Sequence, residues 1–338
     1  MTHEIKLLFQ TLKSWQQLGK KAVFVTVVDL EGSSYRRPGV RMVINEDGDS
    51  VGAVSGGCIE KEIERQAQSV FKNGNAKLMT YDGRLRIGCE GILHILIEPV
   101  FLSEELLKDF ETVLKRRQNF RMDVYYYPEV GEYKSAGTLI TLNEKTYSLN
   151  PFFEPFQIDN QECFSQVFNP LFQMYIFGAE HDAVQLCQAA KLLGWEVTIV
   201  ASAEESKSCD YFPGASALIT PFFENIDTSA LDEQTAVVIM THSFNKDVQY
   251  LMALKDIKPA YIGIVGSIKR RERLLSTLLD YFPDISSEFL DQIHSPAGIN
   301  IGAETASEIS VSILAEILSV IRNKKPESLR NKVDSIHG

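Results

Sequence analysis

The sequence predicts an α/β protein of two domains. An N-terminal α+β domain of mixed sheet and helices is expected over residues 1–160, and a C-terminal doubly wound parallel sheet with helices on both faces over residues 170–325. Three observations favour this organisation. The chain has 338 residues, which exceeds the roughly 150 of one typical domain. A hairpin pattern occurs in the first half, and strands alternate with helices in the second.

In the first half, apolar residues at helical spacing from Ile5 to Trp15 predict an amphipathic helix that ends at Gly19. The apolar run 22–30 predicts a buried strand. We then expect a hairpin of 41–45 and 50–54, a helix over 58–71, strands at 76–81 and 92–100, a helix capped by Ser103, and antiparallel strands at 121–127, 137–142 and 145–149. The segment 150–170 contains three prolines and no clear period, so we predict that it links the domains.

In the second half, strands are expected at 174–177, 196–200, 217–219, 236–240 and 260–265. Helices fill most of the intervals. The first of them covers 182–193, and the last covers 305–321, where Thr305 and Glu308 have the spacing of a capping box. Short connections between alternating strands and helices indicate a parallel sheet that is covered on both faces.

The composition is that of an ordinary globular chain, with 44% hydrophobic residues, 23% charged residues and a formal net charge of −11. Such an acidic chain lacks the basic footprint that nucleic acid or an anionic membrane surface requires. It shows no apolar run near the roughly 18 residues of a membrane span and no signal peptide. Five cysteines without a CxxC pair indicate reduced thiols, so we expect a cytoplasmic protein without a structural zinc site of the usual spacing.

A glycine motif follows the strand at 174–177. Gly178 and Ala183 stand at two positions of the fingerprint G-x-G-x-x-G/A, so a Rossmann-like unit is predicted. Glu180 replaces the middle glycine and puts a carboxylate where a pyrophosphate would approach the backbone. The second strand also ends without the acidic residue that would bind a ribose hydroxyl. NAD(P) binding is therefore weakened, and a Rossmann scaffold with an altered phosphate site is the favoured interpretation.

Two further turns carry glycines and a thiol. In the first, Ser55, Gly56 and Gly57 precede Cys58, and amides of such a turn can face an anion. A helix N-terminus would also lower the pKa of Cys58 and favour its thiolate. A small buried thiol under a glycine turn explains the pattern equally well. The second turn has Cys89 between Gly88 and Glu90.

Basic residues lie near two other strand ends. The loop 31–39 contains Arg36 and Arg37, and Arg41 follows it. Guanidinium groups suit a phosphate or another oxyanion. Pairing with the chain's own carboxylates is the alternative. Gly266 and Ser267 open a helix whose first turns are basic, which is unfavourable unless an anion or carboxylates compensate. This makes the turn a candidate second phosphate site. His242 is expected at the same edge of the sheet, where a hydrogen-bonded structural role is the alternative.

Together these segments resemble the xanthine dehydrogenase accessory protein family (XdhC/CoxI), over nearly the whole chain. The first half carries E-G-S-x-x-R-R-P-G at 31–39 and S-G-G-C-x-E at 55–60, and Cys89 falls where members have C-G-G. The second half carries Thr241-His242, Tyr261-Ile262-Gly263 with Gly266-Ser267, and the motifs between Ile293 and Thr305. The chain departs from the family pattern at Glu180 and Glu90, where members have glycine.

The resemblance implies an accessory factor that binds the molybdenum cofactor (molybdopterin) as cargo and assists its sulfuration and insertion into a xanthine dehydrogenase-type enzyme. The implied partners are that apo-enzyme, a cofactor sulfurase and a second copy of the chain in a homodimer. Arginines and helix N-termini suit the phosphate of such a cargo, and thiolates suit its metal. The cofactor-binding residues would be Arg36, Arg37, Ser55, Gly56, Gly57, Cys58, Cys89, Gly178, His181, His242, Gly266 and Ser267, with Cys58 and Cys89 as metal ligands.

Three functions stay open at this point. The first is a cofactor-binding chaperone without turnover of its own. The second is an NAD(P)-dependent oxidoreductase that uses the Rossmann-like half. The third is a docking scaffold without a small-molecule site. For the first, we expect the two domains to share one site, because the Arg36/Arg37 loop and the Gly266 turn both suit a phosphate-bearing ligand.

Overall fold

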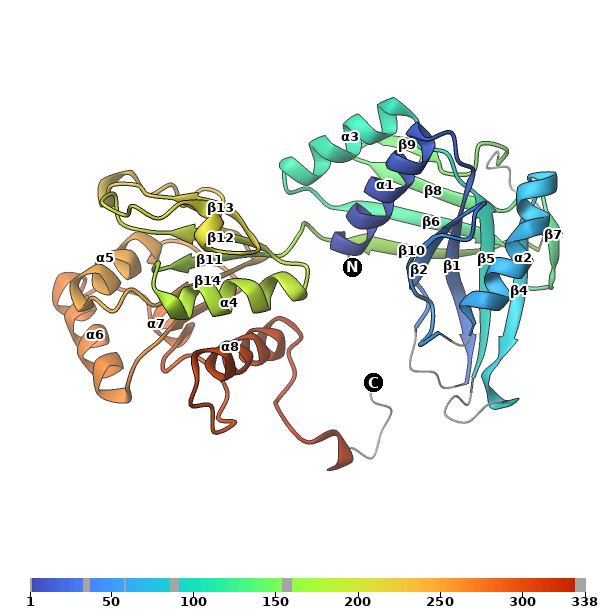
Figure 1. The fold of residues 1–338 in the computed structure, drawn as a ribbon. Helices are drawn as coiled ribbons and strands as arrows, with labels where there is room; N and C mark the ends of the chain where they lie inside the picture. Colours follow the sequence, from blue (N-terminus) through green and yellow to red (C-terminus); the bar gives the residue numbers. More distant parts are fainter. Residues whose placement is uncertain (1, 33–36, 58, 86–90, 154–159, 332–338) are drawn as a thin grey trace. The chain divides into compact units, whose positions relative to one another are not determined.

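The chain folds into two compact units, Met1–Pro170 and Leu171–Gly338 (Figure 1). The computed structural model describes residues 2–32, 37–57, 59–85, 91–153 and 160–331. Within these residues no helix is long and apolar enough to cross a lipid bilayer.

The first unit contains two sheets. The larger has the strand order β3-β2-β1-β5-β4-β7 and the smaller has the order β10-β6-β8-β9. Every strand pairing in both is antiparallel, so the mixed sheet of the prediction is in fact two antiparallel sheets. The elements are α1 (Thr2–Gln17), β1 (Ala22–Glu31), β2 (Arg41–Asn45), β3 (Ser50–Gly52), α2 (Glu60–Asn73), β4 (Ala76–Asp82), β5 (Ile92–Pro99), α3 (Glu104–Lys115), β6 (Phe120–Tyr126), β7 (Gly131–Tyr133), β8 (Gly137–Leu142), β9 (Lys145–Ser148) and β10 (Glu162–Phe168).

The two faces of the larger sheet bury different partners, because side chains alternate along each strand. Val23, Val25 and Val27 of β1 pack with Ile63 and Ala67 of α2 in one core. On the opposite face, Phe24 packs with residues of α1, α3 and the smaller sheet in a second core. Helix α2 therefore lies along one face of the sheet and connects its two ends (Figure 1).

The segment predicted as a linker, 150–170, contains a strand instead. β10 pairs with β6 along its whole length, from Glu162 opposite Tyr126 to Phe168 opposite Phe120. It is an edge strand, and it buries only Phe168 fully. The prolines at positions 151, 155 and 170 flank this strand rather than interrupt it, which is why their presence misled the prediction.

The second unit is the predicted doubly wound sheet. Its order, β13-β12-β11-β14-β15-β16, is parallel throughout and corresponds to 3-2-1-4-5-6 in the unit's own chain order, the order of dinucleotide-binding folds. The elements are β11 (Gln173–Phe177), α4 (His181–Leu192), β12 (Glu196–Val200), β13 (Ala215–Ile219), β14 (Thr235–Ile239), α5 (Phe244–Leu254), β15 (Tyr261–Ile264), α6 (Ile268–Tyr281), α7 (Ser287–Asp291), β16 (Ile293–His294) and α8 (Ala306–Ile321).

Helices cover both faces of this sheet. Leu186 of α4 and Ile313 of α8 belong to one core, and Leu251 of α5 and Leu274 of α6 belong to the other. The predicted capping box at α8 is confirmed: the Thr305 hydroxyl accepts from the amide of Glu308, and the Glu308 carboxylate accepts from the amide of Thr305. Strand order then reverses between β11 and β14, which is where ligands of such folds bind.

Candidate functional site

In the first unit, three loops are attached at the same end of the strands of the larger sheet, which is called this edge of the sheet below. β1 ends at Glu31 and β4 ends at Asp82, and both residues pair with Ile92, the first residue of β5. β3 runs toward the same edge, because it is antiparallel to β2 as β1 is. Described neighbours of Arg36, Cys58 and Cys89 in the sequence therefore attach at this edge, although these three residues lie outside the described part of the chain.

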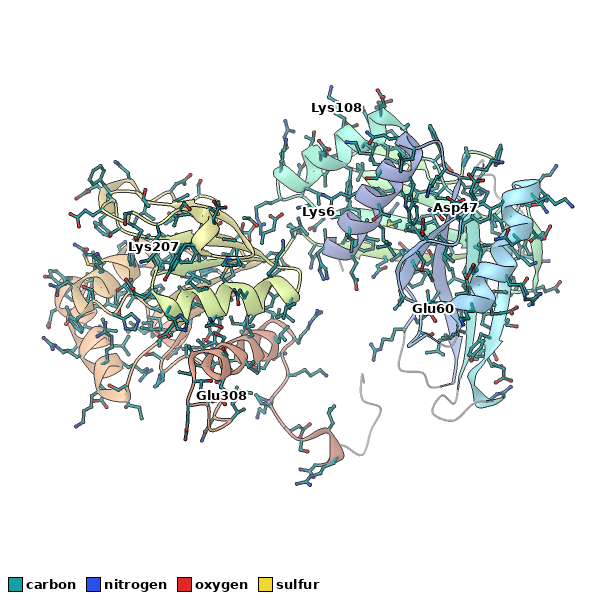
Figure 2. All side chains as sticks on the ribbon, viewed as in Figure 1. Lys6, Asp47, Glu60, Lys108, Lys207 and Glu308 are labelled. Carbon is teal, nitrogen blue, oxygen red and sulfur yellow. The ribbon has the colours of Figure 1, made fainter. Side chains whose placement is uncertain are left out.

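The turn between β3 and α2 is built around the carboxylate of Glu60, the first residue of α2 (Figure 2). Its Oε1 accepts from the amide of Ser55 at 2.8 Å, and its Oε2 accepts from the Ser55 hydroxyl at 2.7 Å and from the amide of Ile59 at 3.2 Å. The Ser55 hydroxyl oxygen also accepts from the amide of Gly57 at 3.1 Å. The hydrogen-bond donors of the turn therefore point at an anion, and this anion is the carboxylate of Glu60.

The charge of Glu60 is stabilised there. Partial burial raises its pKa, but the hydrogen bonds from Ser55 and from the backbone amides lower it more, so the pKa lies below its usual range. The glycines keep the turn open. Gly57 has φ +106°, and an added Cβ at Gly56 or Gly57 would meet no atom within 4 Å. Amides that face an external anion are one of the two interpretations of the sequence pattern, and in the structure the Glu60 carboxylate accepts from the amides of Ser55 and Ile59.

The helix begins at Glu60, later than the predicted start at Cys58, with Ile59 as its N-cap residue. The helix thus starts two positions after the predicted one, and Cys58 itself lies outside the described residues. Within the described ranges, no group of three or more His, Cys, Asp or Glu residues is arranged to hold a metal ion. Because Cys58 and Cys89 lie outside those ranges, their assignment as metal ligands stays a prediction.

The two described arginines of the segment 31–41, Arg37 and Arg41, differ in burial. Arg37 is exposed, whereas Arg41 is buried inside β2, where its Nη1 donates to the carbonyl of Gly39 at 2.7 Å and to Oε1 of Gln166 at 2.6 Å. Burial lowers the pKa of Arg41 to about 10, and the charges of Glu98 and Glu4 oppose this shift. Its assignment to an oxyanion loop is thus corrected, because the register of β2 turns this side chain into the interior.

Sequence reasoning missed a histidine at the same edge. His94 of β5 lies 2.9 Å from Oε1 of Glu31 through its Nε2 atom, and only 10% of its side chain is exposed. Among the residues that the structure describes, its buried Nδ1 atom has no hydrogen-bond partner. The two residues are 63 positions apart in the chain, so only the antiparallel pairing of β1 and β5 reveals their proximity.

In the second unit, the Gly178 turn has the geometry that its motif predicts. Gly178 has φ +139°, and an added Cβ would come within 2.5 Å of the carbonyl oxygen of Met240. Ala183 is buried where α4 meets the sheet. Glu180 is the N-cap residue of α4 but makes no side-chain cap hydrogen bond, and its Oε1 lies 3.9 Å from the Nζ atom of Lys207. A carboxylate therefore does stand at the start of α4.

His181 and His242 lie near this turn, on either side of the point where strand order reverses. His181 begins α4 and is exposed. His242 follows β14 with φ +56°, and its Nε2 atom is 3.7 Å from Oδ2 of Asp182 in the first turn of α4. The structure thus places His242 at the predicted carboxyl edge of the sheet, beside the opening of α4.

The Gly266 turn is covered by the chain's own arginine. The Nη2 of Arg270 donates to Oδ2 of Asp247 at 2.6 Å, and the Asp247 side chain is only 1% exposed. The Cδ atom of Arg270 lies 2.6 Å from where a Cβ on Gly266 would stand. The Ser267 hydroxyl caps α6 by accepting from the amide of Arg270. The sequence makes Arg270 a candidate for binding an external phosphate. In the structure it pairs with the carboxylate of Asp247 instead.

Comparisons with known proteins agree with this architecture. Residues 15–82 match the family described as the XdhC and CoxI family, and residues 174–317 match the XdhC Rossmann domain. A protein of Bacillus subtilis (strain 168), named as a probable xanthine dehydrogenase subunit, is 27% identical over 88% of this chain and 93% of its own length. The "Molybdenum cofactor insertion chaperone PaoD" of Escherichia coli (strain K12) is 26% identical, over 92% of this chain and 86% of its own.

A solved structure agrees as well. The crystal structure of a protein described as a xanthine dehydrogenase from Bacillus halodurans superposes with a TM-score of 0.76 at 27% identity. The match covers 94% of this chain and 96% of that one. With family models that match residues 15–82 and 174–317, and relatives that match over most of their own length, the chain belongs to the XdhC and CoxI family.

Proposed function

We propose that this protein is an accessory factor in the maturation of a molybdenum enzyme, and that it binds the molybdenum cofactor as cargo on its first unit. The name of the Escherichia coli relative supports a role of this kind. The observation that carries the proposal is the Ser55–Glu60 turn, which collects two backbone amides and a hydroxyl around a negative charge. An anionic group of the cargo would find the same donors.

Binding at this turn would exchange the Glu60 carboxylate for an anionic group of the cargo. Glu60 holds the donors while the turn is empty, and an incoming phosphate would replace one anion by another. The Glu60 side chain is only partly buried, so on exchange its carboxylate would move into solvent, and the loss of its hydrogen bonds would cost about 1–2 kcal/mol. Arg36, Arg37, Cys58 and Cys89 are the proposed companions of the turn, with the guanidinium groups on the phosphate and the thiolates on the metal. The protein itself would perform no turnover.

The finer assignments belong to the same proposal. The recipient is an apo-enzyme of the xanthine dehydrogenase type, as the name of the Bacillus subtilis relative suggests. A cofactor sulfurase acts before delivery, and the chain works as a homodimer. The protein is cytoplasmic, because five cysteines at low density fit a reducing compartment. In the second unit, Gly178, His181 and His242 stay proposed cofactor-binding residues, whereas Gly266 is covered by Arg270 and Ser267 caps α6.

The test is to produce the protein in a molybdenum-replete host and to analyse released small molecules by mass and absorbance. We expect a pterin from the natural protein and several-fold less from Cys58→Ala, Cys89→Ala and Ser55→Ala. Cys163→Ala is the matched control, because this thiol is exposed on β10. Equal pterin content in all four variants would remove the assignment of the site, and no pterin in any of them would remove the cargo.

A further inference from the structure

A cavity of about 550 Å³ lies at the other end of the first unit's larger sheet. It is lined by the last residues of α1 and α2, the start of β1, the segment that follows β5, and Pro151 with Phe152. Helix α2 starts at the candidate site and ends at this cavity. Its 14 residues separate the two by about 20 Å, at 1.5 Å per residue. The volume is within the range of small-molecule sites.

Aromatic rings form one part of the lining. Phe101 is 52% exposed and Phe152 is 64% exposed, so folding leaves two phenylalanine rings largely uncovered at one place. Phe152 is nevertheless held in position. Its amide donates to Oδ1 of Asn150, and its ring lies 3.2 Å from where a Cβ on Gly74 would stand. The backbone at Phe152 and the place of its ring beside Gly74 are therefore set by the fold, which limits the entropy lost on binding.

The charges of the lining have one sign. It contains Lys20, Lys21 and Lys72 and no carboxylate, in a chain whose net charge is −11. Lys20 pairs with Asp47 at 2.9 Å and with Asp49 at 3.4 Å. The ammonium groups of Lys21 and Lys72 make no ion pair or hydrogen bond within the residues that the structure describes. Lys72 also faces the negative end of its own helix, where a cation is favourable.

We propose that this cavity binds a small aromatic ring compound that carries a phosphate, with the ring against Phe101 and Phe152 and the phosphate at Lys21 and Lys72. Stacking on aromatic side chains and charge-assisted hydrogen bonds are the two interactions that such a ligand needs. A nucleoside monophosphate and the pterin phosphate of the proposed cargo share this chemistry. The site is distinct from the Ser55–Glu60 turn and stands without the proposed function.

The first experiment is calorimetric titration of the full chain with guanosine monophosphate. Guanosine and inorganic phosphate, at matched ionic strength, serve as the two fragments. We expect the monophosphate to bind at least tenfold more tightly than either fragment. Phe152→Ala and the double variant Lys21→Gln with Lys72→Gln should each weaken it about tenfold or more, whereas Lys108→Gln on α3 should not. No binding by the natural protein, or equal affinity in all variants, would overturn the proposal.

A second experiment identifies the source of the phosphate. Pterin released from the protein made in a molybdenum-replete host is compared between the natural chain and Phe152→Ala. A lower pterin content means that the cavity holds the cargo itself. Unchanged pterin together with lost monophosphate binding means that it holds a separate nucleotide. A chain that binds the monophosphate but never contains pterin would keep this cavity and contradict only the proposed function.

Discussion

The Ser55–Glu60 turn of the first unit and the Gly266–Arg270 turn of the second both open a helix through glycine, and the chain's own side chains fill both. In the first, the carboxylate of Glu60 accepts from the amides of Ser55 and Ile59. In the second, Arg270 folds over Gly266 and pairs with Asp247, while its amide donates to Ser267. The first turn is arranged around an anion, and the second is covered by a cation.

This difference separates two sites that look alike in sequence. A turn that already stabilises a carboxylate offers the donors that another anion needs. A turn whose arginine is committed to a buried aspartate must break an ion pair before it can bind anything. The comparison therefore predicts that the Gly266 turn is mainly a structural element and that the Ser55–Glu60 turn is the exchangeable one.

The largest expected effect comes from Asp247→Ala. The substitution leaves Arg270 without its buried partner and removes one of the two acceptors of the Thr241 hydroxyl, the other being the carbonyl of Ser243. We expect the free energy of unfolding to fall by about 3 kcal/mol, as for other broken buried pairs, measured by urea denaturation. Asp280→Ala, on the exposed face of the same helix as Arg270, should change it by less than about 0.5 kcal/mol. A loss below about 1 kcal/mol for Asp247→Ala would end the contrast between the turns.

Glu60→Gln should have an intermediate effect. It removes the charge that two amides and a hydroxyl stabilise, so we expect a loss of about 1–2 kcal/mol, against almost none for Glu64→Gln on the same helix. Since folding lowers the pKa of Glu60, its contribution is complete above the unfolded-state pKa of about 4.5. It disappears as the pH falls through the lower folded-state pKa. Urea midpoints measured from pH 7 to pH 3 should therefore converge for Glu60→Gln and the natural chain, and a constant gap would contradict the assignment.

The backbone of the first turn gives a smaller and more specific effect. Gly57→Ala places a Cβ on a residue with φ +106°, which costs about 1 kcal/mol although no atom is near. Gly56→Ala is the matched control, because its φ is not in the left-handed region and its surroundings are equally open. Thermal unfolding of the two variants should differ accordingly, and equal stabilities would show that the turn adapts to a side chain.

Features that the sequence predicted correctly are local ones. Ser103 accepts from the amide of Leu106 at α3, three residues away, and Thr305 and Glu308 cap α8 over the same distance. The Gly178 turn likewise depends on a strand, a glycine and a helix that follow one another. Such features are recognisable because the residues that make the contact are also neighbours in the chain.

Features that the sequence did not reveal depend on contacts between distant segments. The motif residues Tyr261, His294 and Gly298 converge on Glu316 of α8: its Oε2 accepts from the Tyr261 hydroxyl at 2.6 Å and from the Gly298 amide at 2.8 Å, and its Oε1 lies 3.5 Å from Nδ1 of His294. Gly263 is required there because the Tyr261 ring lies over it. The resemblance identified these positions, but only the fold shows that they form one packed network.

The smallest expected effect on stability comes from Glu180→Gly, at a third strand-to-helix turn. Glu180 makes no cap hydrogen bond, and its contact with Lys207 is 3.9 Å long at 60% exposure of its side chain. The free energy of unfolding should therefore change by less than about 0.5 kcal/mol. The substitution restores the middle glycine of the fingerprint and removes a negative charge from the opening of α4, so it tests whether Glu180 alone prevents dinucleotide binding.

Calorimetric titration with NAD and NADP shows whether the Gly178 turn can bind an anion, as proposed for the Ser55–Glu60 turn, or is structural, as proposed for the Gly266 turn. We expect no heat with the natural chain and measurable binding with Glu180→Gly, because the tight Gly178 turn is already in place and only the carboxylate occupies the phosphate position. Glu180→Gln is the control that removes the charge but keeps the bulk. If the natural chain binds NAD, the carboxylate is no barrier, and the Gly178 turn belongs with the exchangeable Ser55–Glu60 turn. If Glu180→Gly stays silent, the missing acidic residue at the end of β12 matters more than the charge, and the turn is structural, as the one at Gly266 is.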